Sequence, residues 1–303
     1  MSSIEAQRTG GGSRMLIDYT TFLVARRPSS SKDAMLSFRP RLVRCLALSV
    51  SAAVSALSFA APRAAAQENY EIQVYGSLTM PAGITMFELH SNYTLIGRRS
   101  LSGDGELPTY HALHETVEIT HGFNGWSELG FYWFMSKPDG QGFQWVGTHL
   151  RPRFSIPESW GWPVGLSISQ EIGYARARFS ADTWTYELRP IIDKEFGRLY
   201  VSLNPVLGKS LRGPNAAAPF EFTPNVQVGY DITKVVNLAI EYYGATGTIK
   251  RSEPLADQEH VVYAAVNLDL GPAWEFNFGY GTAMTGGGDK RVVKLILGRR
   301  IGK

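Results

Sequence analysis

Charged side chains beyond residue 66 recur at alternate positions of short runs whose other positions are mostly apolar. Alternate side chains of an extended chain point to one side, so these groups share a face. The face carries more acids than bases, which mildly favours cations. Its acids are Glu88, Glu118, Glu128, Glu171, Glu187, Glu221, Glu241, Asp269 and Glu275, and its bases are Arg151, Arg153, Arg189 and Lys294.

Two roles fit these opposed charges. They could line a polar constriction that selects solutes by charge, or they could pair with one another and fill a polar core. We favour pairing for any single residue because buried charges are normally paired, and we place Arg151, Arg153 and Arg189 at its centre. The predicted charge network comprises Arg151, Arg153, Arg189, Lys294, Glu118, Glu128, Glu171, Glu187, Glu221, Glu241 and Glu275.

No catalytic, cofactor-binding or metal site is predicted. His90, His114 and His149 lie on neighbouring runs, but sequence spacing does not fix the distance between runs. A single histidine on a polar face is more often part of the scaffold than a metal ligand. The glycine-rich stretch 286–289 lacks a following helix or lysine, so it indicates a turn rather than a phosphate site.

A hydrolase is the enzyme alternative, and it would use histidines and acids near the outer ends of the runs. The candidates are His111 and His260, with Asp104, Glu106, Asp257 and Glu259 nearby in sequence. Neither histidine has an evident serine at the same depth on a neighbouring run, as lipid hydrolysis would require. We therefore favour a protein that is not an enzyme and keep the outer-rim His/acid site as the alternative.

The elements that carry these residues are predicted to be strands. Apolar and polar side chains alternate over about ten residues at a time, between turns rich in Gly, Pro, Asn and Asp. Residues 274–281 show the pattern, with aromatic side chains at even positions. Twelve runs are predicted: 84–97, 110–122, 126–136, 143–156, 164–179, 183–194, 199–208, 220–231, 236–249, 260–270, 273–284 and 291–301.

The links between the runs alternate between long and short. Long loops at one end, short turns at the other and an even strand number are typical of a bacterial outer-membrane barrel. Runs of this length also suit tilted strands that cross a bilayer. The fold class is therefore predicted as all-β, a single antiparallel up-and-down transmembrane β-barrel of 12 strands over residues 84–303.

The face opposite the charges is almost wholly apolar or aromatic, as in Phe131 and Trp133 or Phe276 and Phe278. Apolar and polar side chains would also alternate in a soluble sandwich or lipocalin-like barrel. With charges inside and aromatic rings outside, however, the arrangement is the reverse of the one that a protein adopts in water. A closed barrel in lipid requires that arrangement. The predicted location is the outer membrane, with the lipid bilayer and the outer-membrane assembly machinery as partners.

The chain before the barrel is predicted to have three parts. Residues 1–34 are an unstructured or mis-assigned extension, and 35–66 read as a secretory signal peptide that ends in Ala64-Ala65-Ala66. Residues 67–83 are a periplasmic segment, either a strand or a plug. Nine of the 30 basic residues but three of the 27 acidic ones precede residue 67, so the positive net charge is no argument for nucleic acid.

Several stretches resemble the outer-membrane family of meta-pathway phenol degradation proteins, which is transporter-like. They are residues 186–194, 197–200 and 204–205, with 118–122, 128–132 and 241–244 contributing. The resemblance implies an outer-membrane barrel that handles aromatic or other small solutes, and it assigns no catalytic residue. The chain departs from the usual aromatic C-terminal residue of such barrels, because it ends at Ile301-Gly302-Lys303.

The predicted function is to pass or hold small solutes, aromatic ones included, in a narrow charged lumen. Besides the hydrolase, a second alternative to solute passage is a sealed structural or surface-interaction barrel, which would use the loops 98–109, 209–219 and 250–259. No cofactor is expected.

Overall fold

A computed structural model of the protein describes residues 69–102 and 105–302. The predicted extension (1–34) and signal peptide (35–66) lie outside these residues. The described strands are β1 (Thr85–Ile96), β2 (Leu113–Gly122), β3 (Ser127–Lys137), β4 (Gln144–Ser155), β5 (Gly165–Ala175), β6 (Trp184–Phe196), β7 (Leu199–Arg212), β8 (Glu221–Asp231), β9 (Val236–Ala245), β10 (Gly247–Thr248), β11 (Arg251–Ser252), β12 (Glu259–Leu268), β13 (Trp274–Ala283) and β14 (Arg291–Ile301).

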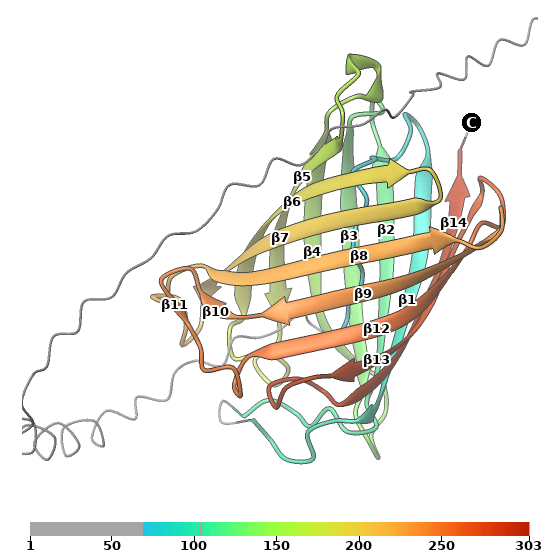
Figure 1. Cartoon of the computed structure of the whole chain (residues 1–303). Coiled ribbons are helices and arrows are strands. Elements are labelled where there is room, and N and C mark those ends of the chain that lie inside the picture. The colour runs from blue at the N-terminus through green and yellow to red at the C-terminus, as the bar shows by residue number, and fades with distance from the viewer. Residues whose placement is uncertain (1–68, 103–104, 303) are drawn as a thin grey trace, which may run out of the picture. The chain divides into compact units, whose positions relative to one another are not determined.

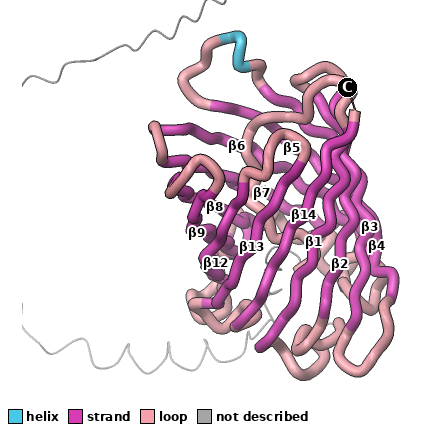
Figure 2. The backbone as a smooth tube through the Cα atoms, turned by 90° about the vertical axis from the view of Figure 1, so that its right-hand side faces the viewer, coloured by secondary structure: helices cyan, strands magenta, loops and turns pink. Residues whose placement is uncertain are grey.

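Twelve long strands form one closed antiparallel barrel (Figures 1 and 2). Each pairs with the next long strand along the chain, and β1 closes the ring by pairing with β14 from Thr85↔Ile301 to Ile96↔Arg291. The two-residue strands β10 and β11 form a small hairpin in the link between β9 and β12. The predicted fold class, 12-stranded and up-and-down, is confirmed.

The strand bounds follow the predicted runs closely, with three larger differences. β5 ends at Ala175, four residues before the predicted end, and β7 continues four residues further, to Arg212. The predicted run 236–249 leaves the wall after Ala245, where Gly247 has a φ of 103°. That left-handed conformation suits glycine and turns the chain into the hairpin.

The two ends of the barrel differ in their connections. One end, which we call the loop end, carries the links that are longer on average: 97–112, 138–143, 176–183, 213–220, 246–258 and 284–290. The links 123–126, 156–164, 197–198, 232–235 and 269–273 share the other, which we call the turn end. One 3-10 turn is present in the described residues, η1 (Glu158–Trp160), and it lies at the turn end, the same end of the barrel as the C-terminus (Figure 2). By the usual orientation of such barrels, the loop end is extracellular.

The two faces of the wall meet different surroundings. Outward aromatic and aliphatic side chains are exposed, for example Phe131 (40%), Trp133 (42%) and Ile240 (54%). Inward Glu118 (1%) and Lys294 (0%) are buried. Such an apolar exterior has a favourable environment only in lipid, and the closed wall satisfies the strand edges there. None of the described helices is long and apolar enough to cross a bilayer.

The N-terminal segment (residues 69–83) runs inside the barrel from the loop end to the turn end. Asn69 Nδ2 donates to Asp289 Oδ2 at the loop end (3.0 Å), and Thr79 Oγ1 donates to the Gly125 carbonyl at the turn end (3.1 Å). Between them, Asn204 exchanges hydrogen bonds with the backbone of Tyr75. We expected a periplasmic segment, whereas these contacts follow the interior. The sequence had left open whether it plugs the barrel.

Two apolar clusters pack the segment against the inner face of the wall. One contains Ile72 and Val74 with Tyr243, Val261, Tyr263 and Val292 from the wall. The other contains Tyr70 with Tyr132, Phe134 and Val146. The interior is therefore partly apolar where the segment passes.

Candidate solute pathway in the barrel interior

Two arginines on β4 form the centre of the interior charges. Arg151 and Arg153 are two residues apart, so both point inward, and they are 2% and 4% exposed. Arg151 Nη2 donates to Glu118 Oε1 (2.6 Å), and Arg153 Nε lies 2.7 Å from Glu128 Oε1. Arg151 Nη1 also lies 3.4 Å from Glu128 Oε1, which links the two pairs.

A glycine makes room for this pairing. Gly130 on β3 faces Arg151 on β4. A Cβ at Gly130 would lie 3.2 Å from both Nε and Nη2 of Arg151. The guanidinium therefore lies across the glycine and reaches Glu118 on β2, the next strand.

The ring of Tyr75, on the N-terminal segment, lies among three guanidiniums. The Cζ atoms of Arg151, Arg153 and Arg189 are 4.7, 5.5 and 5.0 Å from its centroid. Such distances correspond to cation–π contacts. The Tyr75 hydroxyl donates to Glu71 and lies 3.1 Å from the Tyr132 hydroxyl. The centre of the barrel thus binds a phenol side chain.

The third predicted arginine has a partner on its own strand. Arg189 Nε donates to Glu187 Oε1 (2.7 Å), two residues away on β6. Glu171 pairs with His149 rather than with an arginine. The structure therefore brings Arg151, Arg153, Glu118 and Glu128 into direct contact, and joins Arg189 to that group through the ring of Tyr75.

A separate pair lies on the opposite part of the wall. Lys294 on β14 pairs with Glu241 on β9, although β13 and β12 stand between these strands. Lys294 Nζ also donates to the Ile72 carbonyl (3.0 Å). Asn277 Nδ2 and the Tyr243 hydroxyl donate to Glu241 at 3.1 and 2.7 Å. This pair therefore fixes the segment as well as the wall.

The remaining predicted acids are dispersed. Glu275 pairs with Arg300 near the turn end (3.0 Å). Asp269 lies in a turn and accepts from the Gly271 N–H. Glu221 is half-buried at the loop end, without an ion pair to any residue of the described chain. Glu88 lies beside His90 and Glu118.

The three predicted inner histidines do not meet. His90 Nε2 lies 3.3 Å from Glu118 Oε2, and His149 pairs with Glu171. His114 packs edge-on against Tyr70, with 4.6 Å between the ring centroids.

Some interior groups were missed at the sequence level. Asp193 and Arg300 continue the inward alternation of β6 and β14, so extending the pattern would have found them. Glu71 and Tyr75 lie on the N-terminal segment, outside the strand runs, and no periodic signal identified them.

A cavity of about 650 Å³ opens into the interior near the turn end. Its lining includes Tyr75, Glu118, Arg151 and Arg153 from the centre, and Asp193 and Arg300 near the rim. Solutes at this end can therefore approach the buried charges up to the ring of Tyr75.

The outer-rim histidines have non-acidic partners. Nδ1 of His260 lies 2.6 Å from the Tyr242 hydroxyl, and its Nε2 lies 2.8 Å from Gln258 Oε1. His111 stacks on Tyr110, with 3.8 Å between the ring centroids. Asp104 lies outside the described residues. These contacts assemble no nucleophile–histidine–acid arrangement in the part of the rim that the structure describes, and the hydrolase stays a prediction.

Comparison with known proteins gives structural neighbours. No protein-family profile matches the chain, and no curated protein matches it. The solved "COG4313 outer membrane channel from Pseudomonas putida F1" is similar over 76% of this chain and 100% of its own, with 12% identity and a TM-score of 0.53. NanC porin covers 72% of this chain and 99% of its own, with 9% identity and a TM-score of 0.47. KdgM porin covers 71% of this chain and 98% of its own, with 10% identity and a TM-score of 0.45.

The similarity to the first of these structures supports the β-barrel fold. A 12-stranded barrel of this kind, with an exposed apolar exterior, is an outer-membrane protein.

Proposed function

We propose that this outer-membrane barrel passes small solutes and that its N-terminal segment is the gate. The observation that carries the proposal is a charged interior filled by a segment that belongs to no strand of the wall. The wall keeps its hydrogen bonds when such a segment moves, so opening does not break the barrel.

Two carboxylates, one in a loop and one on the wall strand β6, hold the segment at its two ends. Near the loop end, Asp289 of the link 284–290 accepts from Asn69 of the segment and from Thr109 of the link 97–112, at 3.0 and 2.6 Å. Near the turn end, Asp193 accepts from the backbone N–H and the hydroxyl of Ser77, at 2.8 and 2.6 Å. A hydrogen bond to a charged group contributes about 1.5–3 kcal/mol, so removing these two acceptors weakens the hold on both ends of the segment.

We propose aromatic solutes as the preferred cargo. The resemblance to phenol degradation proteins implies them, and Tyr75 supports the idea because its side chain is itself a phenol held by three guanidiniums. When the segment withdraws, an aromatic solute can occupy the same position. A ring that also carries a carboxylate gains a charge-assisted contact with the arginines.

Conductance in planar bilayers tests the gate. We expect conductance steps from the wild-type protein and a larger open fraction from the double variant Asp193→Ala/Asp289→Ala, because each end of the segment loses one carboxylate acceptor. Asp139→Ala, which removes an exposed loop carboxylate, is the matched control and should behave as wild type.

Liposome swelling tests the cargo. 4-Hydroxybenzoate should enter faster than its saturated counterpart 4-hydroxycyclohexanecarboxylate, which lacks the aromatic ring. Equal rates would leave a channel without aromatic preference. Absence of both conductance and swelling, in wild type and double variant alike, would refute solute passage and favour a sealed structural barrel.

A further inference from the structure

Glu88 and Glu118 occupy directly opposed positions on neighbouring strands. β1 and β2 pair with Glu88 facing Glu118, and both side chains point inward. They are 8% and 1% exposed. Like charges directly opposite one another in a sheet are unfavourable, and burial increases the cost because solvent screens them less. A positive charge between them would remove this repulsion.

Neighbouring arginines neutralise only part of this group. Arg151 donates to Oε1 of Glu118, which leaves Oε2 directed towards His90. A third carboxylate, Glu275, lies two strands from Glu88 across Gly298, and Arg300 pairs with it. Glu88 has no ion pair with any residue of the described chain, and its buried Oε1 has no hydrogen-bond partner there.

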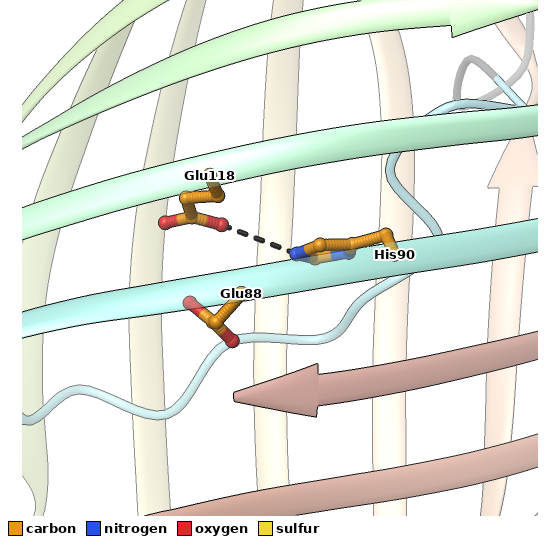
Figure 3. A group of neighbouring side chains, drawn as sticks. All are labelled: Glu88, His90 and Glu118. Atoms are coloured by element: carbon orange, nitrogen blue, oxygen red, sulfur yellow. Dashed lines mark ion pairs between the residues drawn. The ribbon is translucent and has the colours of Figure 1, made fainter. Parts of the chain in front are cut away.

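His90 supplies a nitrogen ligand at the same place. Figure 3 shows its ring directed towards the Glu118 carboxylate, with Glu88 two residues away on the same strand. The ring is completely buried, and neither ring nitrogen makes a hydrogen bond with correct geometry to the described residues. One oxygen of each carboxylate and one nitrogen of His90 lie within 4.8 Å of one another.

We propose that Glu88, His90 and Glu118 bind one divalent transition-metal cation, with Zn²⁺ as the best fit. One imidazole nitrogen and two carboxylate oxygens form a donor set that zinc accepts, with a fourth position open to water. Ligands of tetrahedral zinc lie about 3.3–3.4 Å apart at metal–ligand distances of 2.0–2.1 Å. Nε2 of His90 and Oε2 of Glu118 are already 3.3 Å apart. Glu88 completes the set by a rotation of its side chain.

An ion can reach this site from the turn end. Glu88 and Glu118 both line the cavity of about 650 Å³. The cation would balance the carboxylates of Glu88 and Glu118, while Arg151 remains on the other oxygen of Glu118. Binding does not require solute passage, so the proposal stands or falls independently of the proposed function.

Zinc binding to the untagged full-chain protein in detergent tests this site. After treatment with a chelator, equilibrium dialysis against Zn²⁺ with metal analysis should give one zinc per chain. Glu88→Gln and His90→Gln should each weaken binding at least about 100-fold, because loss of even an outer-shell partner costs about 10–100-fold. His121→Gln, which removes a rim histidine bonded to Thr85, is the control and should bind as wild type.

Either of two binding results would overturn the proposal. One is a wild-type protein without bound zinc. The other is undiminished binding by both Glu88→Gln and His90→Gln. Resistance to unfolding on unheated gels checks that each variant is folded. X-ray absorption of the wild-type complex gives a second measure, since it should show one imidazole among oxygen ligands, and a shell without imidazole would also refute the site.

Discussion

Replacing Lys294 by Met removes the positive partner of a buried ion pair and keeps most of its apolar stem. Lys294 and Glu241 are 0% and 1% exposed, so the pair is closed off from bulk solvent. Removing one member of a buried pair typically costs about 3–5 kcal/mol, because the remaining charge is uncompensated. We expect Lys294→Met to lower the free energy of unfolding by that amount.

The surroundings of the pair allow a sharper test. Glu241 also accepts from Asn277 and Tyr243, so Gln at position 241 keeps hydrogen-bond partners after the charge is gone. The double variant Lys294→Met/Glu241→Gln should therefore recover part of the lost stability, since replacing both members of a buried pair is often nearly neutral. The bond from Lys294 to the Ile72 carbonyl remains lost in both variants.

Urea unfolding of the protein in detergent micelles, followed by tryptophan fluorescence, measures these differences. Unheated gel migration checks that each transition reports unfolding of the barrel. Lys250→Met, at an exposed loop lysine, should change stability by less than about 0.5 kcal/mol. Two outcomes would refute the reasoning. One is a Lys294→Met variant within about 1 kcal/mol of wild type, since a loss of stability of that size is common for any substitution. The other is a double variant as unstable as the single one.

Two further predictions concern the wall. Ile240→Arg puts a charge on the lipid face of β9 and should lower the free energy of urea unfolding by about 2–4 kcal/mol. Ile249→Arg, at a similarly exposed position in a loop, should be nearly neutral. Equal effects of the two substitutions would contradict a lipid exterior. Gly147→Val should prevent correct pairing of β4 with β5, because its Cβ would lie 1.9 Å from the Tyr174 carbonyl oxygen, and the heat-resistant gel band should disappear. Gly142→Val has free space and should keep the band.

The period of the side chains determined much of this fold at the sequence level. Successive side chains of a strand point to opposite faces, so an apolar face and a charged face can be distinguished without coordinates. That period identified the twelve wall strands, and it separated outward residues such as Phe131 and Trp133 from inward ones such as Glu118 and Lys294. The alternation of long and short links along the chain distinguished the two ends of the barrel.

Which charges meet depended on tertiary structure. Arg151 and Glu118 are separated by β3, so their contact requires the register of three strands and the space over Gly130. Lys294 and Glu241 are three strands apart in the ring, and only the curvature of the closed barrel brings them together. Register and curvature arise from pairing along whole strands, and a single run does not encode them.

The route of the N-terminal segment was also decided by tertiary structure. Residues 69–83 form no strand. Ile72, Val74 and Gly76 alternate in the sequence, but so short an alternation left open whether the segment is a strand or a plug. Gly122 provides space where the backbone of Met80 and Pro81 passes, since a Cβ there would lie 2.2 Å from the Met80 carbonyl oxygen. Tyr75 lies among the arginines because β4, which carries Arg151 and Arg153, β6, which carries Arg189, and the segment meet at one place. The local pattern of a strand shows whether a side chain points into or out of the barrel. Which side chains it contacts across the interior depends on how the entire wall closes.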